Sequence, residues 1–273
     1  MREIAREKTY LCEFGWKGIR FGSYGSGTAM AISYRAVALS DAGRVRAHNE
    51  DRVAHTRTPR GIVWMVCDGM GGHVAGEKAA ELAIQAVVDF FSRAPEEPPP
   101  RLLELALYEA NEAIYKIGQL HPQYRRMGTT CVLALYTHGR VYYAHVGDSR
   151  LYLYRDRQLM QKTQDHSYVQ FLISQGLLTP EEAQFHPRRH VILRALGLSS
   201  RPEPEVAPEP IEVRSGDVLL LCSDGLSGML AEEEMSAILA ESAPVEGRAR
   251  RLIEAANAAG GHDNISVVLV EFV

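Results

Sequence analysis

The sequence predicts an α+β fold in which mostly antiparallel sheets carry helices on their outer faces. Short apolar runs of strand length come in groups and do not alternate strictly with helical segments, which argues against a doubly wound parallel sheet. Strand-like segments also stand at both ends of the patterned region, at 34–40 and 264–273. We expect these two segments to share one core, so residues 30–273 are predicted to form one domain.

The first half of the chain changes from strand to helical patterns. Residues 34–40 and the apolar run 61–67 are predicted strands. Residues 75–92 are rich in Ala, Glu and Leu, and their apolar positions recur at helical spacing, which predicts an amphipathic helix. The proline-rich stretch after this helix ends it, and a second helix is predicted over 101–119.

The second half of the chain returns to strands. Four short strands joined by tight turns are predicted to form an antiparallel meander: 129–136, 140–146, 150–155 and 158–163. Residues 166–186 are predicted to be helical, with a second short helix beginning at Pro180. A proline-rich surface connection is predicted over 201–210 and a strand over 217–223. Two helices, over 232–242 and 246–260, and a last strand over 264–273 complete the order.

The composition excludes several classes of protein. The 273 residues are 46% hydrophobic and 23% charged with a formal net charge of −4, which is typical of a globular chain and offers no strongly basic face for nucleic acid. No apolar run approaches the roughly 18 residues of a membrane helix. Residues 1–29 lack a clear period and the compact apolar stretch of a signal peptide. We expect them to be a disordered tail, or an extension upstream of a start at Met30.

The four cysteines are scattered along the chain, at Cys12, Cys67, Cys131 and Cys222. None forms a C-x-x-C pair or stands near a histidine at zinc spacing. We interpret them as core thiols in a reducing compartment, because free cysteine is usually buried and disulfide frameworks belong to oxidising compartments. The sequence therefore favours a cytoplasmic protein.

Four aspartates stand at the ends of apolar strands, each beside a small or turn-forming residue: Asp68, Asp148, Asp224 and Asp263. Asp and Gly also end strands for purely structural reasons, so ordinary turns remain an alternative. If the four carboxylates converge, their repulsion has to be relieved by cations or protons. An all-oxygen ligand set favours Mg²⁺ or Mn²⁺ over zinc, and two such ions can activate a bridging water for displacement at phosphorus.

Six segments stand in order along the chain: SDAGRVRAHNEDR (40–52), CDGMGGHVAGEKAAE (67–81), MGTT (127–130), HVGDSRLYLYR (145–155), CSDGLSGML (222–230) and GHDN (261–264). They resemble the type 2C, metal-dependent protein serine/threonine phosphatases, in particular the compact bacterial members that oppose serine/threonine kinases. The resemblance extends from about residue 34 to residue 273. It implies a four-layer α-β-β-α sandwich, which agrees with the element order above, and a mobile flap within 163–197.

The resemblance implies a role for individual residues of the acidic motifs. Asp68 would bridge two metal ions, and the backbone carbonyl of Gly69 would bind the second of them. Asp224 and Asp263 would complete the protein ligands of the first ion, and Asp148, together with Asp224, would hold a third, weaker ion. The cofactors implied are therefore two or three Mn²⁺ or Mg²⁺ ions.

The same resemblance implies hydrolysis of phosphoserine and phosphothreonine by direct attack of a water that bridges two metals. Arg46 would grip the substrate phosphate, because a guanidinium offers the planar fork that a phosphate prefers, and Asp68 and Asp224 would complete the catalytic set. Glu50 and Asp51 would contact metal-bound waters. The expected partners are phosphorylated proteins and a cognate kinase. The enzyme is expected to be a monomer that binds neither nucleic acid nor membrane.

The proton donor to the leaving oxygen is not identified by the sequence. Some eukaryotic relatives carry a histidine directly after the Asp-Gly pair, where this chain has Met70. His73 lies nearby in a glycine-rich loop, where it can pack or cap as well as act, and a metal-bound water can also serve. In the flap, three basic residues can meet a phosphoprotein or form a solvated turn: Arg188, Arg189 and His190.

Other functions fit the residues less well. Residues 71–78, GGHVAGEK, have the glycine spacing of a phosphate-binding loop, but Glu77 stands where the lysine belongs and Lys78 comes one residue late. A cysteine phosphatase needs an arginine six residues after its nucleophile, and none of the cysteines has one. The serious alternative is a catalytically silent relative that acts as a binding module. Its expected mark is the loss of an acidic ligand, and all four aspartates are present.

Overall fold

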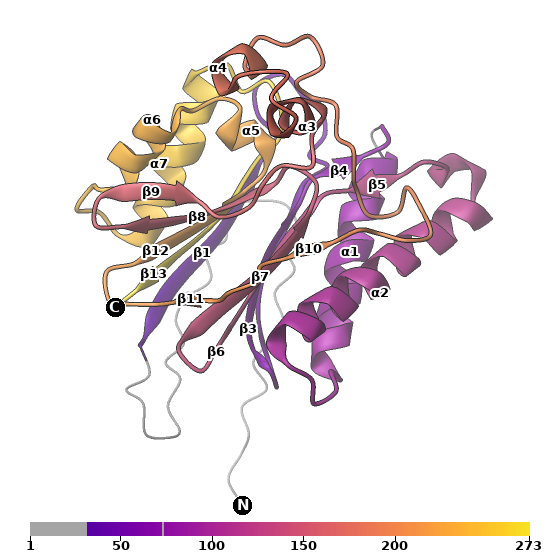
Figure 1. The fold of residues 1–273 in the computed structure, drawn as a ribbon, viewed down its shortest axis with the longest axis horizontal. Coiled ribbons are helices and arrows are strands. Elements are labelled where there is room, and N and C mark those ends of the chain that lie inside the picture. The colour runs from indigo at the N-terminus through magenta and orange to yellow at the C-terminus, as the bar shows by residue number, and fades with distance from the viewer. Residues whose placement is uncertain (1–31, 73) are drawn as a thin grey trace, which may run out of the picture.

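Two antiparallel sheets lie face to face, and helices cover the outer face of each (Figure 1). The structure, a computed structural model, describes residues 32–72 and 74–273. The predicted α+β class and the four-layer α-β-β-α arrangement are confirmed. The tail expected over 1–29 lies outside the described residues, as does His73, and the single domain over 30–273 stays a prediction.

The first sheet joins the two ends of the described chain. Its strands follow the order β1 (Tyr34–Asp41), β13 (Ile265–Phe272), β12 (Val218–Cys222), β8 (Arg150–Arg155) and β9 (Gln158–Gln161). Each neighbouring pair is antiparallel. β1 and β13 pair along their whole length, which confirms that the first and last predicted strands share a core.

The second sheet contains a strand that the sequence pattern did not predict. Its order is β10 (Glu205–Val206), β7 (Arg140–Val146), β6 (Cys131–Thr137), β3 (Gly61–Cys67) and β2 (Arg52–Thr58), and β11 (Ile211–Glu212) also pairs with β7. β2 was missed because an edge strand can be rich in polar residues. β10 corrects the loop expected over 201–210, and the prolines of this stretch lie outside both short strands, which pair at the edge of the sheet.

The meander predicted over 129–163 is wrong. β6 and β7 pair in the second sheet, whereas β8 and β9 pair in the first. The turn 147–149 carries the chain from one sheet to the other, and Gly147 adopts a positive φ of 106° there. A Cβ atom on Gly147 would lie 2.6 Å from the side chain of Thr130. Glycine is therefore required at the crossing between the sheets.

Long helices cover both sheets (Figure 1). α1 (Val74–Ser92) and α2 (Pro99–Leu120) pack on the second sheet, and α6 (Glu232–Leu239) and α7 (Val245–Ala258) pack on the first. The short elements are α3 (Tyr168–Ser174), α4 (Pro180–Ala183), α5 (Asp224–Ser227), η1 (Pro122–Tyr124), β4 (Gly69–Met70) and β5 (Gly128–Thr129). None of the helices in the described part of the chain has the length and apolar character needed to cross a lipid bilayer.

Strand β3 shows why one stretch of the sequence is apolar throughout. All seven of its residues are buried, because helices cover one face of the strand and the first sheet covers the other. Met65 and Cys67 pack beneath α1 and α2, while Trp64 and Val66 pack between the sheets. Burial stabilises large apolar side chains by roughly 1.5–3 kcal/mol each. This packing holds the strand end that precedes Asp68 in a fixed place.

Strand ends from both sheets meet at one edge of the sandwich, which we call the acidic edge. Strands β3, β7 and β12 end there, and β6, β8 and β13 begin there. In Figure 1 this edge lies at the top, beside α3, α4 and α5. Because neighbouring strands run in opposite directions, loops far apart in the sequence leave the sandwich side by side. These loops carry the predicted acidic residues.

Candidate active site

The four aspartates predicted as metal ligands all lie at the acidic edge. Asp68 follows β3, Asp148 lies between β7 and β8, Asp224 opens α5, and Asp263 precedes β13. Asp148 is buried and the other three are half-buried. Asp224 departs from the expected strand-end turn, because it begins a short helix. Both sheets thus contribute carboxylates to the same end of the molecule.

The carboxylates are close enough for their charges to interact. Burial raises the pKa of Asp68 well above its usual value, and four neighbouring charges raise it further, those of Asp51, Asp224, Asp148 and Asp263. Burial also raises the pKa of Asp148 to about 8, and the charge of Asp224 contributes. In the absence of cations, the folded chain therefore favours protonated carboxyl groups at this edge.

Asp224 interacts with several members of this group. Burial raises its pKa, and the charge of Asp263 raises it further, whereas a hydrogen bond with Asp68 lowers it. The Oδ1 atom of Asp224 is buried and has no hydrogen-bond partner. A carboxylate oxygen that is dry and unpaired costs free energy, so this atom is suited to a cation.

Asp51 was expected to contact only metal-bound waters, and the structure buries it more deeply than that role requires. Its exposed fraction is 1%, and burial raises its pKa to about 8, although hydrogen bonds from Ser266 and Ser223 lower it. The hydroxyl of Ser223 donates to Asp51 Oδ2 over 2.7 Å, while Oδ1 has no partner. Sequence reasoning missed Ser223. Its position directly before Asp224 is the signal that could have found it.

Three unpartnered oxygen atoms test whether this edge suits a metal: Oδ1 of Asp51, Oδ1 of Asp148 and Oδ1 of Asp224. All three are buried carboxylate oxygens, and hard divalent cations such as Mg²⁺ and Mn²⁺ prefer oxygen ligands. Bringing such a cation to the edge would also relieve the repulsion that, after burial, raises the pKa values. The residues present therefore fit the expected ions.

Two glycines allow three segments to meet beside Asp68. A Cβ atom on Gly69 would overlap the backbone of Gly76, and a Cβ atom on Gly76 would overlap the side chain of Glu50. The strand β4, the first turn of α1 and the loop that carries Glu50 can therefore approach one another only with glycine at both positions. Gly69 was predicted at the site. The need for Gly76 arises from packing and has no separate signal in the sequence.

Asn264 fixes the loop that carries Arg46 and Glu50. Its side-chain oxygen accepts a hydrogen bond from the backbone N–H of Glu50 over 2.8 Å. Its amide nitrogen donates to the backbone oxygens of His48 and Ala42, over 2.9 and 3.0 Å. One buried side chain at the start of β13 thus holds the whole loop 42–50 against the acidic edge. Sequence reasoning did not assign this role.

Arg46 lies exposed at the rim of the site. Its Nη2 atom is 2.7 Å from Oδ2 of Asp263, so the predicted phosphate ligand and a predicted metal ligand form an ion pair. A guanidinium has five N–H donors in a planar fork. The pair with Asp263 therefore leaves Arg46 with donors for an incoming phosphate.

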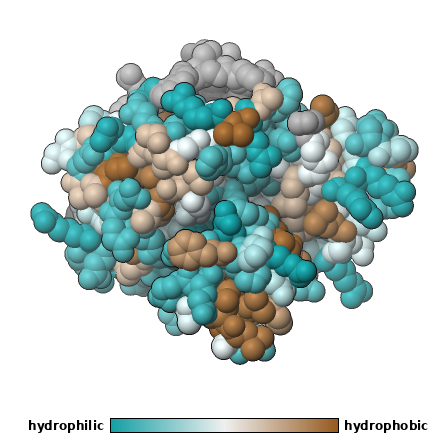
Figure 2. Space-filling model, turned by 90° about the horizontal axis from the view of Figure 1, so that it is seen from above, coloured by the Kyte–Doolittle hydropathy of each residue, from teal (hydrophilic) through white to brown (hydrophobic). Residues whose placement is uncertain are grey.

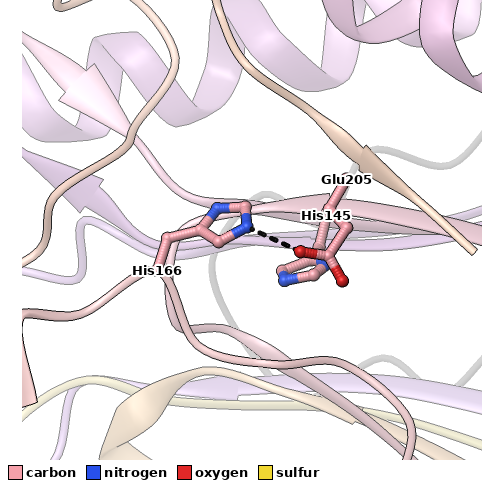
Figure 3. Close-up of side chains that lie close together, drawn as sticks. All are labelled: His145, His166 and Glu205. Atoms are coloured by element: carbon pink, nitrogen blue, oxygen red, sulfur yellow. Dashed lines mark hydrogen bonds and ion pairs between the residues drawn. The ribbon is translucent and has the colours of Figure 1, made fainter. Parts of the chain in front are cut away.

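A second cluster of possible metal ligands lies close by, formed by His145, His166 and Glu205 (Figure 3). Their ligand atoms lie within 4.8 Å of one another, and the two imidazole rings stack with centroids 4.5 Å apart. The aspartates of the acidic edge do not form a group this compact in the described part of the chain. Distance alone therefore favours the histidine cluster as a metal site, and its hydrogen bonds decide the question.

The hydrogen bonds of this cluster leave it unsuited to a metal. Gly147 donates its backbone N–H to Nδ1 of His166 over 3.2 Å, so the ring proton is on Nε2, which faces Glu205 Oε2 at 3.4 Å. Likewise Nε2 of His145 lies 2.8 Å from the carbonyl oxygen of Gln164 and must carry its proton. Burial lowers the pKa of His166 to about 4, so the ring is neutral. The cluster is a hydrogen-bonded support for the turn at Gly147.

The predicted flap region, 163–197, projects beside the acidic edge as α3, α4 and their loops (Figure 1). Ser167 caps α3, and Thr179 forms a capping box with Glu182 at α4. Figure 2 looks onto this end of the molecule and shows apolar groups scattered among polar ones. The region exposes several large apolar side chains: Phe171, Leu177, Phe185, Val191 and Leu193. Its mobility stays a prediction.

The side chains of two basic flap residues, Arg188 and His190, act on other groups. Arg188 lies over the ring of Tyr168, 5.5 Å from its centroid. His190 is near enough to Asp224 for its charge to lower the pKa of that carboxyl group. The flap therefore brings positive charge to the side of the acidic edge.

Comparisons with known proteins agree with this geometry. The family described as Protein phosphatase 2C matches residues 42–259. The serine/threonine phosphatase stp of Listeria monocytogenes is 39% identical over 238 residues, which are 85% of this chain and 93% of that protein. The serine/threonine protein phosphatase PstP of Mycobacterium tuberculosis is 41% identical over 245 residues, which are 89% of this chain and 46% of that protein.

Solved structures share the fold as well as the sequence. The crystal structure of Stp1 from Staphylococcus aureus matches with a TM-score of 0.84 at 31% identity, over 92% of this chain and 99% of that chain. A crystal structure of the catalytic domain of PstP, in complex with two manganese ions, matches with a TM-score of 0.77 at 40% identity, over 88% and 98%. The resemblance drawn from the six segments is confirmed. The chain therefore belongs to the protein phosphatase 2C family and is a metal-dependent serine/threonine protein phosphatase.

Proposed function

We propose that the acidic edge holds the divalent cations on which this family depends. Asp68, Asp224 and Asp263, with the carbonyl oxygen of Gly69, would hold two ions, and Asp148 with Asp224 would hold a third. The observation that carries the proposal is the set of dry, unpartnered carboxylate oxygens in a group of mutually repelling aspartates. A bound divalent cation supplies positive charge to this group and lowers the pKa of a water.

Arg46 is the residue that we propose binds the substrate phosphate. It stands at the exposed rim, and its ion pair with Asp263 aims the guanidinium at the acidic edge. The planar fork can donate two parallel hydrogen bonds to phosphate oxygens, and hydrogen bonds to charged groups contribute about 1.5–3 kcal/mol each. Arg46 would thus orient the phosphorus atom toward the carboxylates while it neutralises part of the phosphate charge.

Glu50 and Asp51 are proposed to orient water at the same site. Their own positions are fixed, since Asn264 accepts the backbone N–H of Glu50 and Ser223 donates to the carboxylate of Asp51. Residues held in this way can present oxygen atoms to water in one geometry. Asp51 retains the unpartnered Oδ1 atom for this purpose.

The leaving serine or threonine oxygen needs a proton, and Met70 has none to give. Because this side chain stands where some eukaryotic relatives have a histidine, we propose that water supplies the proton. The proposal requires that kcat depend on the protonation of water and metal ligands and not on a histidine at this position.

The substrates are phosphorylated proteins, as the family implies. We infer further that the enzyme opposes a serine/threonine kinase of the same cell and acts as a monomer. We also infer a cytoplasmic location. Three buried free thiols support a reducing compartment, those of Cys67, Cys131 and Cys222.

Hydrolysis of a chromogenic aryl phosphate and of a phosphothreonine peptide by the full chain tests the assignment. We expect turnover with Mn²⁺ and none above background with a chelator. Asp68→Asn should lower kcat by about 10³-fold or more, because metal-assisted charge stabilisation contributes several kcal/mol. Circular dichroism should show that this variant keeps its fold.

Asp89→Asn is the matched control, because it removes the same charge from an exposed position on α1. Its turnover should equal that of the wild type. Metal-independent turnover, or an Asp68→Asn variant with wild-type kcat, would contradict the metal assignment. A folded wild-type chain that binds Mn²⁺ and phosphopeptide without turnover would support the alternative of a silent binding module.

A further inference from the structure

Two cysteines lie opposite each other on neighbouring strands at the acidic edge. Cys67 is the last residue of β3, and Cys131 is the first residue of β6. These strands pair antiparallel, with Val66 opposite Val132. The same register places Cys67 opposite Cys131, one step nearer to the edge.

The next hydrogen bond along the ladder fixes the geometry of this pair. The backbone N–H of Thr130 donates to the carbonyl oxygen of Asp68 over 2.8 Å, so Asp68 and Thr130 are a hydrogen-bonded pair. Because hydrogen-bonded and non-hydrogen-bonded pairs alternate along an antiparallel ladder, Cys67 and Cys131 form a non-hydrogen-bonded pair. Such residues have Cα atoms about 4.5 Å apart and side chains in close approach.

Both thiols point to the same side of the sheet. Each is fully buried and belongs to the core cluster beneath α1 and α2. The Cys131 thiol is the largest cause of the raised pKa of Cys67, which agrees with contact between the two side chains. Cys222, the third described cysteine, belongs to the core cluster of the other sheet.

We propose that Cys67 and Cys131 are an oxidative modification site at which a hydroperoxide converts two thiols into one disulfide. One thiol is first oxidised to a sulfenic acid, with reduction of the peroxide O–O bond and release of water. The second thiol then attacks the sulfenic sulfur, and a second water leaves. In total, two thiols and one hydrogen peroxide give one disulfide and two waters.

Burial of the pair makes its oxidation slow. Both thiols are fully buried, and Cys67 directly precedes the half-buried Asp68. Buried thiols react more slowly than exposed ones. Oxidation should therefore take minutes to hours in millimolar peroxide, in contrast to the rapid reaction of a dedicated peroxide sensor.

A disulfide at this rung would alter the phosphatase site. Disulfides occur with Cα separations of 4.4–6.8 Å, mostly 5.5–6 Å, and the pair starts at the short end of that range. Bond formation should push the ends of β3 and β6 apart. Asp68 would move with them, because its carbonyl oxygen is bonded to the backbone N–H of Thr130 and to the hydroxyl of Thr129, each over 2.8 Å.

The test uses the full chain with Cys12→Ala, which removes the cysteine outside the described residues. The protein is treated with hydrogen peroxide, quenched and digested without reduction. We expect mass spectrometry to find a peptide that links Cys67 to Cys131. Phosphatase activity with Mn²⁺ should fall at least fivefold, and dithiothreitol should restore it.

Three variants in the same background decide between explanations. Cys67→Ala and Cys131→Ala should each lose the dithiothreitol-reversible part of the inactivation, whereas Cys222→Ala should keep it. The proposal is overturned if thiol titration shows all three remaining thiols intact after the treatment, or if Cys131→Ala is inactivated and restored like its parent. The linked peptide is measured independently of catalysis, and the activity before oxidation reports separately on the proposed function.

Discussion

The two ends of the sandwich bury polar atoms in different ways. At the acidic edge, carboxylates from both sheets raise one another's pKa values. At the opposite end of the same strands, aromatic rings fill the space between the sheets. Neighbouring rings there have centroids 5.3–6.3 Å apart, and they belong to Tyr34, His55, Trp64, Tyr136 and Phe272.

Unpartnered polar atoms occur at both ends, but the groups are neutral at the aromatic end and can be charged at the acidic edge. At the aromatic end they are Nε1 of Trp64 and Nδ1 of His55. Both groups are neutral, since burial, with the charge of Arg57, lowers the pKa of His55 to about 4. A neutral unpaired group costs about 1–3 kcal/mol, whereas an unpaired buried charge costs far more. The aromatic end is therefore stable as it stands, while the acidic edge needs protons or cations.

After the loss of Asp68, the largest change at the acidic edge should follow from removal of the positive charge at its rim. Arg46→Ala should lower kcat/KM for a phosphopeptide by about 10–100-fold, mainly through KM, because one or two charged hydrogen bonds are lost. The kcat/KM of Arg46→Lys should lie between those of Arg46→Ala and the wild type, since lysine keeps the charge and loses the planar fork of donors. Steady-state kinetics measure both variants.

Arg44→Ala is the control for that measurement, since Arg44 is an exposed arginine of the same loop. Its kcat/KM should stay within about twofold of the wild type, well under 1 kcal/mol. An unchanged kcat/KM in Arg46→Ala would remove the proposed role of Arg46 in binding phosphate.

A smaller effect is expected on the stability of the chelated protein as the pH changes. In the folded state the pKa of Asp148 is raised from 3.8 to about 8, so between these values the unfolded chain has released a proton that the folded chain still holds. Stability then falls as pH rises through this window. The melting temperature should be several degrees lower at pH 8 than at pH 5.

Asp148→Asn sharpens this result, because it removes one titrating group from the acidic edge. Its melting temperature, measured by calorimetry with chelator, should fall less between pH 5 and pH 8 than that of the wild type. Asp89→Asn, at an exposed position, should keep the wild-type difference. A wild-type protein equally stable at both pH values would argue that burial and neighbouring charges do not raise the pKa of these carboxyl groups.

The smallest effect is expected at the aromatic end. Trp64→Phe removes a buried N–H without a partner and leaves a small cavity, and these two contributions are of opposite sign and similar size, about 1–3 kcal/mol. We expect a shift of a few degrees in melting temperature, with kcat and the dependence on Mn²⁺ unchanged. Loss of metal-dependent turnover in this folded variant would show that the two ends are not independent.

The sequence predicted those elements whose apolar residues follow a clear pattern. β3 is an unbroken apolar run because both of its faces are buried, and α1 and α2 bury the apolar residues that recur at helical spacing. β2 was missed because its polar residues do not alternate cleanly along an edge strand. The meander was wrong because a tight turn looks the same whether its two strands pair or separate, and at Gly147 they separate into two sheets.

The site was predictable where a residue's neighbours in the sequence are also its neighbours in space. The four aspartates could be found because they adjoin apolar strands. Asn264 and Gly76 could not, since their contacts join segments that are distant in the sequence. The tautomers of His145 and His166 were likewise beyond prediction, because backbone groups of Gly147 and Gln164 determine them.

The place of β13 in the first sheet has a consequence for folding during synthesis on the ribosome. β13 lies between β1 and β12, and it is the neighbour of β1 in the described part of the chain. A ribosome releases β1 early, but the partner of β1 emerges after almost everything else, so such long-range pairing has to wait. Asp263 precedes β13 and arrives equally late. We therefore expect a nascent chain to hydrolyse phosphoprotein only after Asp263 and β13 have left the exit tunnel.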